Sequence, residues 1–400
     1  MIHNQEAIEC PVGTITKLDT SERSTVYLVE CFNGAQIRIS EIALRLLQWR
    51  WSGIEQSDVA RRLNELIDPP VSDEEALKYV ADLENKIAAL AEKKRAGEPE
   101  FGFKLTLFDA STTARVSGLL LWMFSPLAAI IGVTLIGAGA AAWILEPPGR
   151  QALTPSTAAI AYALFLASLF FHEFGHSTAC LRFGGKCGKI GFTIYLIFPS
   201  FFSDVRSAWA FQRWQRVVVD VAGSYFQCVV GGILAILGVV THFYPFYYAT
   251  LLIAFTTLFN LNPIFKFDGY WMLGDAIGVT NLSKQPKRII NAVVCRMLGK
   301  KHETLPFSAA IISVLVLYSV ITSSTWAAFL VHLALSIFRE PQELYSTFLG
   351  TKYAHFGWTQ AGQFAGTLLG LFLTVYLAFR WARGVRSWVL TLWRGRIDVR

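Results

Sequence analysis

Charged residues are scarce in this 400-residue chain. Asp, Glu, Lys and Arg make up 16% of it, whereas soluble domains carry about 25%. Cysteine is rare too, with 6 residues, which excludes a small disulfide-stapled secreted module. Apolar residues make up 53% and the mean hydropathy is +0.42, which excludes a disordered chain. This composition is typical of a polytopic membrane protein, in which a net charge of +7 can arise from positive residues held on one side of the bilayer.

Charge is missing altogether from five long stretches. They lie between Arg115 and Glu146, Arg150 and Glu173, Asp220 and Lys266, Glu303 and Arg339, and Lys352 and Arg380. A membrane-spanning helix needs about 20 apolar residues. The third stretch is 45 residues long and contains a turn-like segment at 242–245, so we count it as two spans. The sequence therefore predicts six transmembrane helices, near 117–145, 155–181, 217–241, 245–265, 307–338 and 360–379.

Lys and Arg fall on one side of these six spans. The segments 182–216, 266–306 and 380–400 together hold 19 of them, whereas the opposite loops hold 3. By the positive-inside rule both termini are predicted to be cytoplasmic, in a bacterial inner or plasma membrane. Because the first apolar run begins only after 115 residues, we expect no cleavable signal peptide. The cysteines fall in cytoplasmic parts or inside helices, so we expect reduced thiols.

The first 110 residues differ in composition and predict a separate domain. Two strand-like runs, 25–29 and 35–39, flank Asn33-Gly34, which is a hairpin turn signal. Three helical patterns follow, with Ser40, Ser57 and the Ser72/Glu75 capping box at their starts. Residues 1–110 are thus predicted to form a small α/β winged-helix-like cytoplasmic domain. Winged helices commonly bind DNA, but here Arg61 and Arg62 are offset by neighbouring acidic residues, so we expect no nucleic acid partner.

The order of short motifs in this domain resembles the PqqD-like family. The motifs are Val26-Tyr27-Leu28-Val29, Ser40-Glu41-Ile42-Ala43, Ser57 to Leu63, and a long third helix that runs to Leu90. PqqD-like domains recognise precursor peptides in ribosomal peptide biosynthesis. The resemblance covers about 70 residues, and it implies a leader peptide bound by residues 1–110 against a strand edge and the third helix.

The second predicted span carries an H-E-x-x-H motif, His172-Glu173-Phe174-Gly175-His176. On a helix the two imidazoles lie on one face, where they can share one Zn²⁺, with Glu173 beside the metal. Two histidines and a glutamate on a soluble helix would be commonplace. Inside a membrane span, however, ionisable groups are costly and functional by default. The motif therefore predicts a zinc site.

A catalytic zinc site needs a third protein ligand. Cys180 continues the stripe of the two histidines, but it lies about 12 Å from His172 along the helix axis, too far to share one ion with both. Asp268 is the better candidate. The pairs Asn262-Pro263 and Asp268-Gly269 break the fourth span, and such breaks at membrane depth are tolerated only where they line a cavity or are buried. The charge pattern places this break at the cytoplasmic end of its span, at the same depth as the motif.

These motifs together resemble the site-2 protease family of intramembrane zinc metallopeptidases. The resemblance rests on His172 to His176, Asn262-Pro263 and Asp268-Gly269. Segments Ser203 to Trp209 and Ala222-Gly223 are similar to one bacterial branch, the peptide zinc metalloproteases. The resemblance to the site-2 protease family implies that residues 115–280 form the metallopeptidase core. We expect residues 281–400 to form a cytoplasmic linker and two further helices with a basic tail.

The resemblance also implies roles for single residues. His172, His176 and Asp268 would bind zinc, Glu173 would act as general base and then acid, and Asn262 would position the substrate or the oxyanion. Two departures are Ser224, where the family often has proline, and a longer spacing from Asn262 to Asp268 than in well-known members.

The β-rich segment Lys189 to Phe198 is too short to span the membrane as a helix. We predict a hairpin that dips into the membrane interface and holds an extended substrate by strand pairing. The alternative is a buried element without substrate contact. Nearby, Asp204 and Arg206 could form a structural pair, and Asp220 could satisfy a neighbour in the bundle.

The sequence thus predicts a mainly α polytopic membrane protein that is a zinc metalloendopeptidase, hydrolysing peptide bonds within the membrane by metal-assisted catalysis. The expected substrate is a ribosomally made precursor peptide, with an exporter as a further partner. Two alternatives stay open: a regulatory protease that releases a membrane-tethered factor, and a non-proteolytic peptide-binding partner of an exporter. Glu173 argues against the second, because a purely structural zinc site does not need it.

Overall fold

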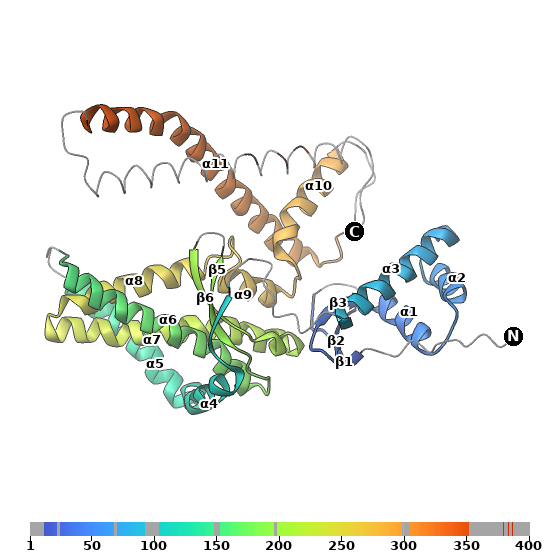
Figure 1. The fold of residues 1–400 in the computed structure, drawn as a ribbon, viewed down its shortest axis with the longest axis horizontal. Helices are drawn as coiled ribbons and strands as arrows, with labels where there is room; N and C mark the ends of the chain where they lie inside the picture. Colours follow the sequence, from blue (N-terminus) through green and yellow to red (C-terminus); the bar gives the residue numbers. More distant parts are fainter. Residues whose placement is uncertain are drawn as a thin grey trace. The chain divides into compact units, whose positions relative to one another are not determined.

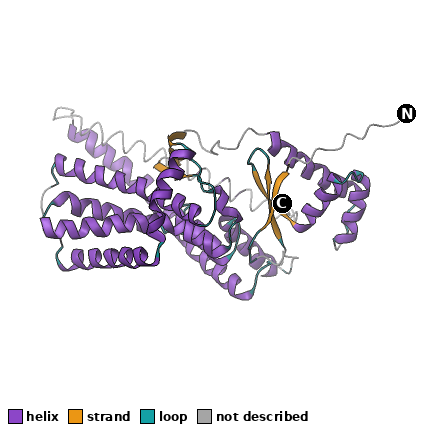
Figure 2. Ribbon diagram, turned by 90° about the horizontal axis from the view of Figure 1, so that it is seen from below, coloured by secondary structure: helices purple, strands orange, loops and turns teal. Residues whose placement is uncertain are grey.

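The computed structural model describes residues 12–21, 25–67, 70–92, 104–147, 153–195, 198–297, 299 and 305–351, together with 379, 383 and 386. This described part of the chain is mostly helical and has two small antiparallel sheets (Figures 1 and 2). It divides into two units: residues 1–284 with 304–311, and residues 285–303 with 312–400.

The first sheet forms the start of the first unit. Its strands are β1 (Val12–Lys17), β2 (Val26–Cys31) and β3 (Gln36–Ser40), antiparallel and in the order β1-β2-β3. The β2–β3 hairpin turns at Asn33-Gly34, as predicted, with Gly34 at φ +79°. Strand β1 was not predicted from the sequence. The Asn33 amide donates hydrogen bonds to the carbonyls of Leu90 and Ala91, 2.7 and 2.8 Å away, and so fastens the turn to the end of the third helix.

Three helices follow the sheet: α1 (Glu41–Trp51), α2 (Gln56–Leu66) and α3 (Asp73–Glu92). Apolar residues at helical spacing form one buried cluster with the sheet, including Leu46, Val59 and Val80. Ser40 caps α1 by accepting from the Ala43 amide, and the predicted Ser72/Glu75 capping box is present. The predicted cap at Ser57 is wrong, because α2 begins one residue earlier and has no side-chain cap.

The rest of the first unit is a helical bundle. It contains α4 (Ala110–Leu120), a short 3₁₀ turn η1 (Leu121–Phe124), α5 (Pro126–Leu145), α6 (Pro155–Arg182), α7 (Arg213–Thr241), α8 (Tyr244–Asn260), α9 (Asp268–Ile277) and η3 (Leu282–Lys284). Ser125 caps α5 and Pro126 occupies its first turn, so the span predicted to begin at 117 begins later. Pro at this position has a suitable fixed φ and lacks the amide that a helix start leaves unbonded.

Helix α7 packs against α5, α6 and α8 (Figure 1). Small residues bring the backbones close. A Cβ on Gly139 of α5 would lie 2.5 Å from the Gly232 Cα of α7, and a Cβ on Gly175 of α6 would lie 2.5 Å from the Ala222 carbonyl oxygen. Small residues at such crossings are the usual basis of close helix packing in membranes.

Four helical segments in the described part of the chain are long and apolar enough to cross a membrane. They are α5, α6, α7 and residues Ala309–Phe329 of α11 (Ala309–Thr351). Helix α8 has 17 residues, somewhat fewer than the roughly 20 that a span requires. The predicted span 360–379 lies almost wholly outside the described residues. The structure therefore agrees with a helical membrane protein but does not confirm six spans. The second unit contains α10 (Gln285–Met297) and most of α11.

The second sheet lies beside α6 (Figure 1). Its strands are β4 (Lys104–Phe108), β5 (Ile190–Tyr195) and β6 (Phe198–Ser203), antiparallel and in the order β4-β5-β6. The hairpin expected near residues 189–198 corresponds to β5 and the start of β6. Strand β4 comes from residues that the sequence placed at the end of the N-terminal domain. A short 3₁₀ turn, η2 (Arg206–Ala210), leads from β6 to α7.

Candidate metal centre

Helix α6 carries the H-E-x-x-H motif on its buried side. The helix starts at Pro155 behind the Thr154 cap, and every residue from His172 to Cys180 is buried. His172 and His176 are only 3% and 8% exposed, and Glu173 is 8% exposed. The two imidazoles lie one helical turn apart, with ring centroids 4.8 Å from each other, as the spacing of four residues predicts.

Asp268 is the first residue of α9 and follows the predicted break in the chain. The Asn262 side chain stabilises this break by accepting a hydrogen bond from the Ile264 amide at 2.9 Å. The chain can turn this tightly only with glycine at position 269, because a Cβ there would collide with the backbone of Leu261. The break therefore places the Asp268 carboxylate, which is distant in sequence, next to the face of α6 that carries the two histidines.

The three side chains converge on one point. The Nε2 atoms of His172 and His176 are 3.1 Å apart, and Asp268 Oδ2 lies 3.0 Å from the first and 3.5 Å from the second. One ligand atom from each residue falls within 4.8 Å of the others. Sequence reasoning brought these residues together, and the structure places them in contact.

Neighbouring groups on α7 orient both imidazoles. His172 Nδ1 lies 3.2 Å from Gln227 Oε1, and the Gln227 amide in turn donates to Ser168 Oγ at 3.2 Å. His176 Nδ1 lies 2.7 Å from the Val219 carbonyl oxygen. Because both partners of the Nδ1 atoms are acceptors, the network assigns the proton to Nδ1 and leaves a lone pair on each Nε2. This is the usual arrangement of metal-binding histidines.

The donor set fits a divalent metal ion. Asp268 Oδ2 is buried and accepts no hydrogen bond from the described residues, although two lone-pair nitrogens face it. Three such atoms repel one another unless a cation lies between them. Two histidines and one carboxylate form a common ligand set for catalytic zinc.

Gly223 on α7 leaves space beside the imidazoles. A Cβ at this position would collide with His176 Nε2 and would lie 2.7 Å from His172 Nε2. The glycine therefore keeps the metal-facing side of both rings open, and any larger residue would occupy the place of the ion.

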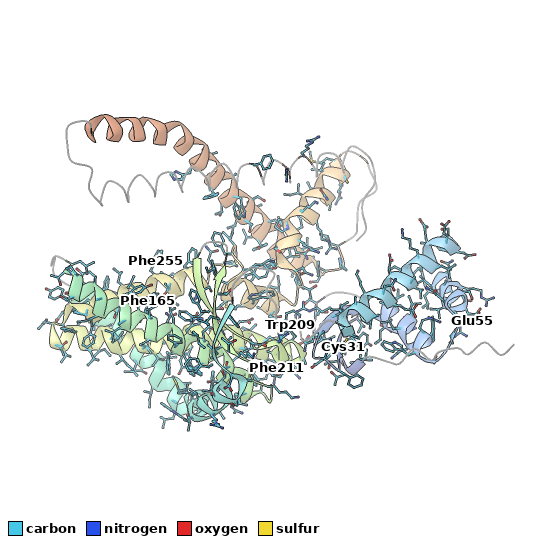
Figure 3. The ribbon with its side chains drawn as sticks, viewed as in Figure 1. Cys31, Glu55, Phe165, Trp209, Phe211 and Phe255 are labelled. Atoms are coloured by element: carbon cyan, nitrogen blue, oxygen red, sulfur yellow. The ribbon has the colours of Figure 1, made fainter. Side chains whose placement is uncertain are left out.

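The three ligands and Glu173 line one cavity of about 1100 Å³. Aromatic residues from α6 and α8 line it as well, among them Phe165 and Phe255, which Figure 3 labels on their two helices. Strand β6 contributes Ser200 to Ser203. The cavity is large enough for a peptide segment, because ligand pockets commonly measure about 300–1,000 Å³.

Other predicted residues have different positions. Of the described residues that line the cavity, Asn260 is one and Asn262 is not. The catalytic role of Asn262 therefore stays a prediction. Cys180 is buried beside Ser207, 3.2 Å from its Oγ, and is not part of the ligand group. The Asp204–Arg206 pair is confirmed, with Oδ2 and Nη2 2.7 Å apart.

Sequence reasoning missed three residues of the site. Gly223 leaves space beside the two imidazoles. Gln227 provides the acceptor for His172 Nδ1, and the Asn260 side chain lines the cavity. The Ala222-Gly223 pair was noted only as part of a resemblance. Gln227 could have been found as the amide in the charge-free stretch 221–241 of α7, since a buried polar side chain needs a partner.

The chain is 27% identical over 111 residues to the "Putative peptide zinc metalloprotease protein YydH" of Bacillus subtilis (strain 168). The alignment covers 27% of this chain and 44% of that protein, so the chain matches under half of the length of this relative. No family model and no solved structure matches the chain. This similarity suggests a metalloprotease and, through the relative's name, zinc.

Proposed function

We propose that this protein is an intramembrane zinc metalloendopeptidase of the site-2 protease type. The observation that carries the proposal is the convergence of His172, His176 and Asp268 on one point, with Glu173 in the same cavity. The candidate spans and the similarity to a peptide zinc metalloprotease support it. We further propose that both termini are cytoplasmic, as the distribution of Lys and Arg indicates.

The residues would divide the work as follows. Zinc held by the three ligands would polarise the substrate carbonyl and acidify a water molecule. Glu173, next to His172 on the helix, would accept the proton of the attacking water and later donate it to the leaving amine. Asn260, in the cavity wall, would hydrogen-bond the substrate backbone. It suits this role better than Asn262, whose carbonyl oxygen already accepts the Ile264 amide.

Strand β6 gives the substrate a place to bind. Within the described sheet it pairs only with β5, so its other edge is unpaired, and its residues line the cavity. An extended peptide that adds to this edge would be held by main-chain hydrogen bonds beside Glu173. A membrane helix has to unwind before cleavage, because its carbonyls are otherwise shielded by the helix.

The substrate class that we propose is a ribosomally made precursor peptide. The support is the resemblance of residues 1–110 to a leader-peptide-binding domain, together with a first sheet that has β1 and β3 as its edges. A leader bound there would bring the precursor to the membrane domain. An exporter would be the natural consumer of the cleaved product.

Removal of the N-terminal domain tests this substrate assignment. The deletion should end before Lys104, because β4 pairs with β5 of the membrane core. We expect a variant lacking residues 1–100 to lose cleavage of a leader-bearing precursor and to keep cleavage of the same peptide without its leader. Equal cleavage of both peptides by full-length and truncated protein would favour a regulatory protease that acts on a membrane-tethered factor.

A further inference from the structure

One carboxylate in the cavity wall, that of Asp220, has no hydrogen-bond or ion-pair partner among the described residues. Asp220 lies on α7, next to Val219, whose carbonyl orients His176, and it lines the same cavity as the metal ligands. Its Oδ2 atom is buried and accepts no hydrogen bond from any described residue. The sequence suggested that Asp220 could satisfy a neighbour in the bundle, but the described part of the chain provides no such hydrogen bond.

The neighbouring cation on α7, Arg216, already has other hydrogen-bond partners. Arg216 precedes Asp220 by one helical turn, yet its Nε donates to Asp275 Oδ1 at 2.7 Å and its Nη1 to the Phe211 carbonyl at 2.7 Å. Its Nη2 donates to the Asp19 carbonyl at 3.0 Å. Asp275 adds a second carboxylate to this end of the cavity, and Lys266, which also lines it, is exposed.

Burying a carboxylate without a counter-charge is costly, and a positively charged group that pairs with it offsets this cost. Apolar side chains also line the cavity, among them Phe165, Leu166, Phe255 and Phe259. The cavity thus combines an apolar lining with a carboxylate, Asp220, that has no ion-pair partner among the described residues. A peptide that matches it has a basic residue beside apolar ones.

We propose that Asp220 is a specificity residue that binds a lysine or arginine side chain of the peptide substrate, close to the cleaved bond. The inference rests on the proposed peptidase function. In the bound state the ammonium or guanidinium group forms the ion pair that Arg216 does not, and the apolar walls hold neighbouring residues of the peptide.

The test compares matched peptides on full-length protein in nanodiscs. Each pair of peptides has the same apolar segment and differs at one position, which holds either lysine or its uncharged analogue norleucine. Six such pairs place this position at six different points along the peptide. For wild type at the best position we expect a kcat/KM for the lysine peptide about tenfold or more above that for norleucine. Asp220→Asn should bring the ratio close to one, and Asp220→Glu should keep most of it.

Two controls make the result decisive. Asp204→Asn removes the same charge outside the cavity lining and should leave the lysine preference unchanged. Zinc content should be equal in all these variants. Equal cleavage of lysine and norleucine peptides by wild type at every position, or an Asp220→Asn variant that slows both peptides alike, would overturn the inference while leaving the proposed peptidase standing.

A binding measurement separates this inference from the peptidase proposal. With Glu173→Gln protein, fluorescence anisotropy of the labelled peptides should show tighter binding of the lysine peptide, and adding Asp220→Asn should abolish the difference. If wild type cleaves no peptide but this difference is present, the recognition site stands and the peptidase fails. If the difference is absent, the recognition site fails.

Discussion

At the scale of single residues, the centre depends on groups that never touch a substrate. The Gln227 amide oxygen and the Val219 carbonyl fix the tautomers of the two histidines, and Gly223 keeps space in front of them. Removing outer partners of metal-binding histidines commonly costs about 10–100-fold in metal affinity. These residues are therefore as testable as the ligands themselves.

The substitution Gly223→Ala should empty the metal centre. Its Cβ would occupy the space between the imidazoles, so purified protein should contain less than about a tenth of the wild-type zinc, measured by atomic absorption, and should not cleave peptides. Gly137→Ala on α5 is the matched control, because no atom lies within 4 Å of its new Cβ. Normal zinc content in Gly223→Ala would contradict the geometry described for α7.

The substitution Gln227→Leu should weaken zinc binding without abolishing it. Loss of the acceptor at His172 Nδ1 lets the ring adopt the other tautomer, so we expect the zinc dissociation constant to rise about 10–100-fold. Competition with a chelator of known affinity measures it. Gln227→Glu keeps an acceptor and nearly the same shape, so it should stay close to wild type; an equal loss in both variants would contradict the role of the acceptor.

At the scale of elements, the sequence predicted what was local and missed what was distant. The H-E-x-x-H helix and the β2–β3 turn are visible in short windows, and both are present. Asp268 was found because charge patterning placed two segments at one depth. The contacts of Gln227 and Val219 join residues 55 and 43 positions apart, and no periodicity encodes which α7 residue faces which histidine.

Strand β4 was missed for the same reason. Its residues, Lys104–Phe108, pair with β5 more than 80 positions away, and a five-residue strand after a polar segment gives little local signal.

The predicted start of the first span, near residue 117, was wrong for another reason, because α5 begins at Pro126. The Ser125-Pro126 pair is a recognisable helix start, but the uninterrupted apolar run around it favoured a single longer span.

The β4–β5–β6 sheet should affect catalysis without affecting the metal. A Cβ on Gly191 in β5 would collide with the Leu105 carbonyl of β4 and lie 2.7 Å from the Phe202 ring of β6. We expect Gly191→Ala to lower kcat/KM for an extended peptide about tenfold or more while zinc content stays normal. Gly118→Ala, whose Cβ would meet no atom within 4 Å, serves as control. Unchanged cleavage would favour the alternative in which the hairpin is a buried element without substrate contact.

At the scale of the whole molecule, composition predicted a membrane protein, and four candidate spans agree with this. The orientation rests on 19 Lys and Arg on one side against 3 on the other. Fluorescent protein fusions that fold only in the cytoplasm should be bright at both termini, and alkaline phosphatase inserted after His242 should be active. A dark fusion at either end would contradict the predicted topology.

The central claim is that Glu173 acts on water at a centre held by His172, His176 and Asp268. The most direct measurement is cleavage of a membrane-embedded peptide by wild type and Glu173→Gln protein with equal zinc content, followed by mass spectrometry. We expect equal zinc in the two proteins and a fall in kcat for Glu173→Gln of about 10²-fold or more, as for loss of a general base. Cleavage by Glu173→Gln at the wild-type rate would rule out this role for Glu173.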